Sequence, residues 1–480
     1  MTTYKGYEMV IGLEVHAELS TKSKIFCSCP TQFGAEPNTQ CCPVCMGMPG
    51  TLPVLNESAV EYAVRAGLAT KCEIAELSKF DRKNYFYPDL PKGYQISQFD
   101  MPICTRGHIE IESESEKKRV RITRIHLEED AGKLIHMTDG GEVYTLVDCN
   151  RCGVPLIEIV SEPDISSADE AKSYLRKLRA VLMFTAVSDC RMNEGSFRCD
   201  VNLSVRKVGG EKLGVRTEIK NLNSFAFVGK AIESEFKRQV DAIESGEQIV
   251  QETRRFDPDS GKTFTMRKKE DADDYRYFPE PDLPPVRLSA AYIDAVRAKI
   301  PPLPDERKEM YVAKWGISPY NAEQLTQSIS TAEYFESVAA LTDYAKSAAN
   351  IIIGELLKTA DEDSEIAFPR TSAAEIAQMS ETEIINSNTA KRIIKMISAG
   401  DARSPKEIVT AEGMGQINDA ALLRAAVEEA AAANLKAVAD MRSGKDAARK
   451  SIVGYVMKKT NGYANPRITD ALVDEIAGAM

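Results

Sequence analysis

The sequence has no apolar run long enough to cross a membrane, for which ~18 consecutive apolar residues would be needed. Its first residues, MTTYKGYEMV, also lack the basic, apolar and small-residue regions of a secretory signal peptide. We therefore expect a cytoplasmic protein without a membrane partner, in which structural disulfides do not form. With 43% hydrophobic and 28% charged residues in a chain of 480, it should be an ordinary globular protein of roughly two to four domains.

The sequence also has no excess of basic residues. Its net charge is −11 and its pI is about 5.3, which argues against a general nucleic-acid-coating protein. The charge is uneven, because residues 421–480 hold nine Lys or Arg against seven Asp or Glu, while the rest carries about −13. An acidic body with a mildly basic end is a weak indication of a charged partner at that end.

Phosphate-binding glycine motifs are missing as well. No G-x-x-x-x-G-K-[ST] or G-x-G-x-x-G follows a predicted strand, so P-loop and Rossmann folds are excluded. The sequence shows no internal repeat and no low-complexity tract. A nucleotide would have to be held by a different arrangement of side chains.

Cysteine, in contrast, is concentrated in one short stretch. The segment KIFCSCPTQFGAEPNTQCCPVCMGMPG holds five: Cys27, Cys29, Cys41, Cys42 and Cys45. Two close pairs across a short loop predict a zinc site, because each pair of thiolates supplies one edge of the tetrahedron that Zn²⁺ prefers. Four thiolates leave no open position, so the role would be structural. Cys41 is next to Cys42, so its side chain should point away from a metal held by Cys42 and Cys45. The alternative interpretation is a set of buried reduced thiols.

A second close pair, Cys149 and Cys152, lies in DCNRCGVP. This pair could be redox-active or could replace Cys27 and Cys29 as metal ligands. Small half-buried thiols at a strand end are the simpler interpretation.

The patterns along the chain change once. Residues 1–285 alternate between apolar and polar residues with glycine turns, which predicts strands and hairpins. Two proline clusters, 278–286 and 300–307, predict a linker region. From Pro304 onward the apolar residues recur at helical spacing, with a polar break at 398–408. The fold class is therefore expected to be α+β.

Several predicted strands carry chemically distinctive polar faces. Side chains alternate along a strand, so the polar face of each comprises Glu14, His16 and Glu18 (residues 9–19), Arg198, Asp200, Asn202, Ser204 and Arg206 (196–206), and Arg216, Glu218 and Lys220 (215–220). A further strand, in RITRIHLEEDAGK, ends with His126, Glu128, Glu129 and Asp130. An ordinary solvated face of an antiparallel sheet would explain the alternation. It explains the residue types less well, since carboxylates suit Mg²⁺ and arginines suit phosphate oxygens.

The motifs of the whole chain resemble the B subunits of the aspartyl/glutamyl-tRNA amidotransferases. The resemblance rests on VIGLEVHAEL, CPVCMGMPGTLPV, FDRKNYFYPDLPKGYQISQ, HLEEDAGK, NRCGVPLIEIVSEPD, MNEGSFRCDVNLSVR, RTEIKNLNSF and DYRYFPEPDLPP, and it runs to VGYVMKKTNGYANP. It implies a glutamine-synthetase-like antiparallel-sheet cradle domain (1–294), an all-helical domain (295–405) and a small helical tail domain that touches tRNA (406–480).

The resemblance also implies a reaction and its participants. The reaction is ATP-dependent amidation of Glu-tRNA(Gln) or Asp-tRNA(Asn), with ATP and Mg²⁺ bound by the cradle domain and zinc in a structural role. Ammonia would come from glutamine through a separate amidase, the A subunit, and a small C subunit would complete a heterotrimer. Two other functions stay open: a non-catalytic zinc-containing scaffold that docks tRNA, and a carboxylate–amine ligase for a free amino acid.

Site residues follow from the same motifs, residue by residue. The cofactor-binding set would be Glu14, His16, Glu128, Asp200, Asn202, Arg206 and Glu218, of which Glu14, His16, Glu128, Asp200 and Glu218 would bind Mg²⁺. The catalytic set would be Lys83, Tyr85, Glu129, Arg198 and Arg216, with Lys83 and Tyr85 near the ammonia outlet or the substrate carboxylate. The zinc ligands would be Cys27, Cys29, Cys42 and Cys45, which some family members lack.

The basic end supplies the predicted tRNA contact. In MRSGKDAARKSIVGYVMKK, Arg442, Lys445 and Arg449 fall at i, i+3 and i+7 and would share one helix face, which Lys458 would extend. A merely solvated charged face is the alternative. The family resemblance favours tRNA at this end.

Overall fold

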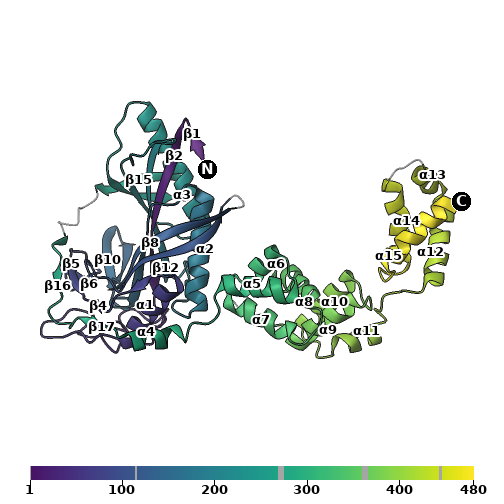
Figure 1. Ribbon diagram of the computed structural model, residues 1–480, viewed down its shortest axis with the longest axis horizontal. Helices are drawn as coiled ribbons and strands as arrows, with labels where there is room; N and C mark the ends of the chain where they lie inside the picture. Colours follow the sequence, from purple (N-terminus) through teal and green to yellow (C-terminus); the bar gives the residue numbers. More distant parts are fainter. Residues whose placement is uncertain (1, 114–115, 269–274, 359–365, 443–445, 480) are drawn as a thin grey trace. The chain divides into compact units, whose positions relative to one another are not determined.

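The computed structural model describes residues 2–113, 116–268, 275–358, 366–442 and 446–479 (Figure 1). The chain divides into two compact units, Met1–Pro304 and Asp305–Met480. The first unit is built on a large sheet with helices, and the second is all helical in its described part, so the protein is mixed α+β.

One ten-stranded sheet organises the first unit. Its strands, in spatial order, are β15 (Lys262–Lys268), β14 (Glu252–Asp257), β13 (Thr217–Lys220), β12 (Phe197–Lys207), β2 (Tyr7–Glu18), β11 (Pro155–Ser161), β8 (Glu116–Glu129), β7 (Cys104–Ser113) and β3 (Glu73–Ile74), with β1 (Thr3–Tyr4) paired to β2. Neighbouring strands are antiparallel except β13 and β14. The long central strands β2, β12, β11 and β8 therefore come from distant parts of the sequence.

Three helices cover one face of this sheet: α1 (Glu57–Ala69), α2 (Ala168–Phe184) and α3 (Phe225–Glu244). Each begins at a side chain that accepts a hydrogen bond from the first turn, namely Asn56, Ser167 and Ser224. Their apolar sides bury the predicted apolar face of β2, in which Ile11, Val15 and Ala17 are fully enclosed. The opposite, polar face of the central strands is thereby left for the site.

These helices differ from the prediction of strands and hairpins throughout residues 1–285. In α2 the buried residues, Tyr174, Leu178 and Val181 among them, recur at helical spacing. The helical period of apolar residues was therefore present in the sequence, but the β patterns on both sides obscured it. The strands predicted around 9–19, 121–129, 196–206 and 215–220 are confirmed as β2, β8, β12 and β13.

The proline cluster 278–286 is part of the first unit and not a linker. Its strand β16 (Phe278–Pro279) joins a small sheet with β5 (Asp81–Asn84) and β6 (Tyr94–Ser97), and β17 (Val286–Arg287) pairs with β4 (Leu77–Ser78). Helix α4 (Ala290–Arg297) follows. A separate hairpin is formed by β9 (Lys133–Asp139) and β10 (Glu142–Asp148).

The second unit begins with α5 (Pro304–Trp315) and contains two hydrophobic cores. The first is centred on buried Tyr311, Tyr334 and Phe335, and the second on Val427, Val456 and Val473. The remaining elements are α6 (Pro319–Leu325), α7 (Ile329–Ala339), α8 (Ala345–Ile351), the π-helical turn η2 (Ile352–Leu356), α9 (Arg370–Glu381), α10 (Ser387–Ser398), α11 (Pro405–Glu412), α12 (Ala420–Ala433), α13 (Leu435–Arg442), α14 (Asp446–Lys459) and α15 (Pro466–Ala479). None of the helices in the described part of the chain has the length and apolar character to span a membrane.

Candidate active site on the polar face of the sheet

The register of four central strands brings the predicted polar residues together. In the β12–β2 pair, Asp200 lies opposite Glu14 and Arg198 lies opposite His16. On the other side of β2, Glu158 of β11 lies opposite His16, and it also lies opposite His126 of β8. One continuous face therefore carries acidic, histidine and arginine side chains over neighbouring strands.

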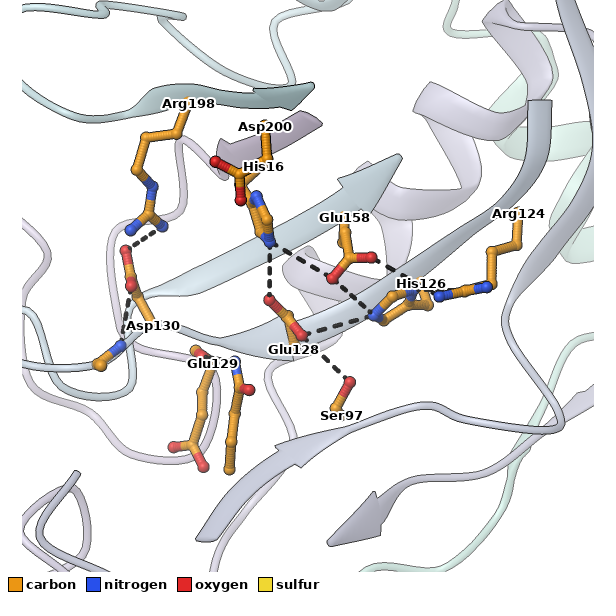
Figure 2. Close-up of polar contacts among 12 residues, drawn as sticks. His16, Ser97, Arg124, His126, Glu128, Glu129, Asp130, Glu158, Arg198 and Asp200 are labelled. Atoms are coloured by element: carbon orange, nitrogen blue, oxygen red, sulfur yellow. Dashed lines mark hydrogen bonds and ion pairs between the residues drawn. The ribbon is translucent and has the colours of Figure 1, made fainter. Parts of the chain in front are cut away.

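His16, Glu128 and Glu158 form the first cluster, and each offers one ligand atom within 4.8 Å of the others. His16 Nε2 lies 3.4 Å from Glu158 Oε2 and 3.7 Å from Glu128 Oε1 (Figure 2). Burial alone would raise the pKa of Glu158, but His126 and His16 reverse the direction and hold it well below the usual range. Burial would lower the pKa of His16, yet its hydrogen bond with Glu158 and the charge of Glu128 raise it. Two ionised carboxylates and an imidazole suit a divalent cation.

Glu14, Asp200 and Glu218 form the second cluster, on β2, β12 and β13, again with ligand atoms within 4.8 Å of one another. The ammonium of Lys220 forms ion pairs with Asp200 and, at 3.4 Å, with Glu218. Burial would lower the pKa of Lys220, but Asp200 and Glu218 raise it well above the usual range. The carboxylates therefore already attract a cation, which is the property a metal site needs.

Neighbouring side chains orient the second cluster. Asn202 Nδ2 donates to Glu14 Oε1 at 2.8 Å, and Thr253 Oγ1 donates to Glu218 Oε2 at 2.8 Å. The two clusters adjoin, because Glu14 and His16 are two residues apart on the same face of β2. Their Cα atoms are thus ~7 Å apart.

A cavity of about 450 Å³ opens on this face. His16 and Glu128 of the first cluster and Asp200 of the second line it, together with Lys83, Tyr85, Gln95, Asp130, Arg198 and Lys220. Arg198 Nη2 donates to Asp130 Oδ2 at 2.7 Å, while its Nε is buried and has no hydrogen-bond partner among the described residues. A guanidinium that is held at one end and lines a cavity is suited to an anionic group.

Lys83 of β5 lies on the aromatic side of the cavity. Its Nζ is 4.9 Å from the ring centroid of Tyr275 and 5.7 Å from that of Tyr85. Burial would lower the pKa of Lys83, but Glu128, Tyr277 and Glu158 raise it well above the usual range. The pKa of Tyr85 is also raised, in this case by burial, so its phenol stays protonated. Tyr85 Oη donates to Gln95 Oε1 at 3.4 Å.

The structure brings together Glu14, His16, Glu128, Asp200, Asn202, Glu218, Lys83, Tyr85 and Arg198 from the predicted set. Three others lie elsewhere. Glu129, which follows Glu128 on a strand, points to the other side, where it accepts from Ile96 N at 2.9 Å and pairs with Lys92. Arg206 donates to Glu8 at 2.6 Å farther along β12, and Arg216 is exposed just before β13.

Glu158 is a site residue that sequence reasoning left out, and Asp130, although named at the end of its strand, was assigned no role. Glu158 sits in PLIEIVS, where a lone carboxylate among apolar residues of a buried strand was the available signal. Asp130 faces Glu18, and burial together with the charge of Asp130 raises the pKa of Glu18 to about 8. The carboxylate of Asp130 is instead kept ionised by Arg198 and Arg151, which lower its pKa against the effect of burial.

The four cysteines predicted to bind zinc do converge. The Sγ atoms of Cys27, Cys29, Cys42 and Cys45 lie within 4.8 Å of one another, which fits a four-thiolate metal site. Cys41 contacts the Asn38 carbonyl instead.

Side chains around this cysteine cluster shape its charge. A hydrogen bond from Cys27, opposed by burial, lowers the pKa of Cys45 to about 4. The fully buried Lys24 donates to Cys45 Sγ at 3.5 Å and to the Cys149 carbonyl at 3.2 Å. Cys149 and Cys152 belong to no metal-ligand group among the described residues.

The predicted tRNA face of α14 is partly neutralised within the second unit. Arg449 donates to both oxygens of Asp474, at 2.8 and 2.9 Å, whereas Lys458 is exposed. Lys445 and the side chain of Arg442 lie outside the described residues.

Comparison with known families defines the class of protein to which the chain belongs. A family model described as the GatB/GatE catalytic domain matches residues 9–294, and one described as a GatB domain matches 333–476. The chain is 52% identical to the B subunit of the aspartyl/glutamyl-tRNA(Asn/Gln) amidotransferase of Caldicellulosiruptor saccharolyticus, covering 98% of both chains. It is 49% identical to that of Carboxydothermus hydrogenoformans and 50% identical to that of Brevibacillus brevis, covering 98% or more of each chain. The chain belongs to the family of aspartyl/glutamyl-tRNA(Asn/Gln) amidotransferase B subunits.

Proposed function

We propose that this chain is the amide-forming subunit of an ATP- and glutamine-dependent tRNA amidotransferase, a carbon–nitrogen ligase. The observation that carries the proposal is one cavity on the polar face of the large sheet, which residues of both acidic clusters line together with Arg198 of β12 and Lys83 of β5. The names of the relatives support charged tRNA as the substrate, with Glu-tRNA(Gln) or Asp-tRNA(Asn) as the two possibilities.

The reaction has one chemical difficulty. A side-chain carboxylate is a poor acyl donor, because oxide is a bad leaving group. Transfer of the γ-phosphoryl group of ATP to a carboxylate oxygen, with release of ADP, gives an acyl phosphate. Neutral ammonia then forms a bond to the carbonyl carbon, phosphate leaves with the electrons of the broken C–O bond, and loss of one proton gives the amide.

The cavity side chains are suited to this sequence. His16, Glu128 and Glu158, together with Glu14, Asp200 and Glu218, would hold Mg²⁺, which neutralises phosphate charge when bound. Arg198, which lines the cavity, would donate to a phosphate or carboxylate oxygen.

The aromatic side of the cavity would act on the substrate carboxylate. Lys83 would stabilise the anionic carbonyl oxygen with its permanently charged ammonium. Tyr85 would serve as a hydrogen-bond donor and not as a base, since its pKa is raised.

The rest of the molecule would serve assembly. Zinc at the four cysteines would be structural, because four thiolates leave no open coordination position. We further propose that residues 1–294 form a cradle domain with glutamine-synthetase-like architecture, followed by helical (295–405) and tail (406–480) domains. An amidase partner would release ammonia from glutamine, a small third subunit would complete the heterotrimer, and the tail would contact tRNA in the cytoplasm.

The test is the Glu128→Gln variant in the reconstituted complex. Gln keeps the shape but removes a charge that the first cluster needs, so ATP-dependent conversion of Glu-tRNA(Gln) to Gln-tRNA(Gln) should collapse. Glutaminase activity of the amidase partner should fall less. Glu142→Gln, on the exposed hairpin, is the matched control and should behave as wild type. Wild-type amidation by Glu128→Gln would contradict the proposal.

The two alternative functions make different predictions. A docking scaffold would bind tRNA but not ATP. The clustered carboxylates and the arginine beside the cavity argue against a scaffold, because such residues suit a metal–nucleotide. A ligase for a free amino acid would form the amide without tRNA. Direct ATP-binding measurements and an assay with free glutamate therefore separate all three.

A further inference from the structure

His126 is a buried histidine that touches the first cluster without belonging to it. It follows Arg124 and precedes Glu128 on the same face of β8, and only 3% of its surface is exposed. Its Nε2 lies 3.5 Å from Glu128 Oε2 and 3.6 Å from Glu158 Oε2 (Figure 2). One ring nitrogen therefore faces both carboxylates.

The other ring nitrogen faces a group that can only donate. Arg124 Nε donates a hydrogen bond to His126 Nδ1 at 3.3 Å, and a guanidinium has no acceptor. Nδ1 must therefore carry a lone pair, and the imidazole proton must be on Nε2. The neighbouring Arg124 Nη2 also lies 3.7 Å from Glu158 Oε1, so Arg124 is anchored on both sides.

We propose that Arg124 fixes His126 in the Nε2–H tautomer, and that this N–H positions Glu128 and Glu158 to bind a divalent cation with His16. The inference rests on the proposed function of the first cluster. His126 is thus a positioning residue, one step removed from the ion. The register supports this, because His126 lies directly opposite Glu158 while Glu128 is two residues farther along the same strand face.

The arrangement explains how two buried carboxylates keep a fixed spacing. Carboxylates repel each other, and a side chain free to rotate would move out of the position an ion needs. An N–H on His126 Nε2, 3.5 Å from Glu128 Oε2 and 3.6 Å from Glu158 Oε2, attracts both oxygens at once and so offsets their mutual repulsion. Glu128 Oε1 lies 3.7 Å from His16 Nε2, while Ser97 Oγ donates to Glu128 Oε2 at 3.2 Å, so a second donor holds the oxygen that faces His126.

The tautomer itself can be observed in the full-length chain. The chain has four histidines, and a long-range ¹H–¹⁵N spectrum of protein labelled with ¹⁵N-histidine distinguishes the protonated from the unprotonated ring nitrogen. The His126 signal, identified by its loss in His126→Gln, should show an unprotonated Nδ1. Arg124→Lys should disturb that signal, because it removes the planar Nε–H. A protonated Nδ1 in the wild-type chain would overturn the proposal.

The effect on the cluster is measured by Mn²⁺ binding to the full-length chain, followed by electron paramagnetic resonance. His126→Phe should weaken the binding ~10- to 100-fold, as expected on loss of a partner that orients metal ligands. His126→Gln, whose amide can donate from the place of Nε2, should restore much of the affinity. His136→Gln, on the exposed hairpin, is the matched control.

Two outcomes separate this inference from the function on which it rests. Loss of Mn²⁺ binding in Glu128→Gln but not in His126→Phe would overturn the positioning role alone. Unchanged binding in Glu128→Gln would overturn both the metal site and the role of His126. The tautomer measurement needs no metal, so it stays decisive even where His126→Phe does not fold.

Discussion

Asp200 of β12 lies directly opposite Glu14 of β2, and the two carboxylates meet Glu218 of β13 at one point of the polar face. Glu14 and Glu218 are separated by about two hundred positions in the sequence. The ammonium of Lys220 lies beside them and forms ion pairs with Asp200 and Glu218. This pairing stabilises carboxylates that would otherwise repel one another.

Asp200→Asn should therefore impair the metal–nucleotide site. The change removes a charged ligand while keeping the shape, so the concentration of Mg²⁺ needed for half-maximal amidation should rise and the rate should fall at least ~10-fold. Excess Mg²⁺ should restore part of the rate. The exposed Asp139→Asn is the matched control. An unchanged Mg²⁺ requirement would place the second cluster outside the reaction.

How much of this site was predictable follows from strand geometry. The alternation of side chains alone placed Glu14 and His16 on the same face of one strand, and Asp200 and Asn202 on the same face of another. The structure confirms both assignments. Which strands are neighbours was not predictable, because β2 pairs with β11 and β12, which are more than a hundred residues away. A shift of one residue in any of these pairings would have turned the site residues of the shifted strand to the core.

The misses have equally specific causes. Glu158 sits in a strand buried on both faces, where alternation gives no polar face to recognise. Glu129 follows Glu128, so the two side chains of HLEED point to opposite faces, and only Glu128 joins the cluster. Helices α1 to α3 were obscured because local β patterns on both sides dominated the interpretation.

Lys83→Met tests the aromatic side of the cavity. It removes an ammonium that faces Glu128 and Glu158, so kcat for amidation should fall while ATP binding changes less. Because the folded-state pKa of Lys83 is raised, the wild-type ammonium persists at least to its ordinary pKa of ~10.4. The loss in Lys83→Met should consequently be equal at pH 7 and pH 9. A loss confined to one end of that range would indicate that another titrating group causes it.

Zinc content tests the cysteine cluster. The double variant Cys42→Ser/Cys45→Ser should lose the metal, of which the wild-type chain should hold about one per molecule. Cys149→Ser/Cys152→Ser is the matched control and should keep it, since these thiols are outside the group of four converging Sγ atoms. Metal analysis of both purified variants is sufficient. Zinc retained by the first variant and lost by the second would reverse the ligand assignment.

Lys24→Met probes the charge of the same cluster. A zinc ion with four thiolates carries two negative charges, and the fully buried ammonium of Lys24 offsets part of that charge beside Cys45. The variant should give up zinc to a competing chelator more readily, by ~10-fold in affinity. Lys22→Met, close in sequence and exposed, is the control. Equal retention of zinc by both variants would show that Lys24 is important for packing alone.

At the basic end of the chain, the four residues predicted to contact tRNA fall into two groups with different expected effects. Arg442, Lys445 and Lys458 are the residues expected to bind phosphate, because the guanidinium of Arg449 is bound to Asp474. Replacing Arg442, Lys445 and Lys458 with Ala should raise the KM for charged tRNA and reduce the slope of its salt dependence by ~1 for each phosphate no longer neutralised. The rate at saturating tRNA should change little, since the cavity is untouched. Arg449→Ala should leave the salt slope nearly unchanged, because its charge is already compensated within the unit. A triple variant with normal tRNA affinity at every salt concentration would show that this face is only solvated surface.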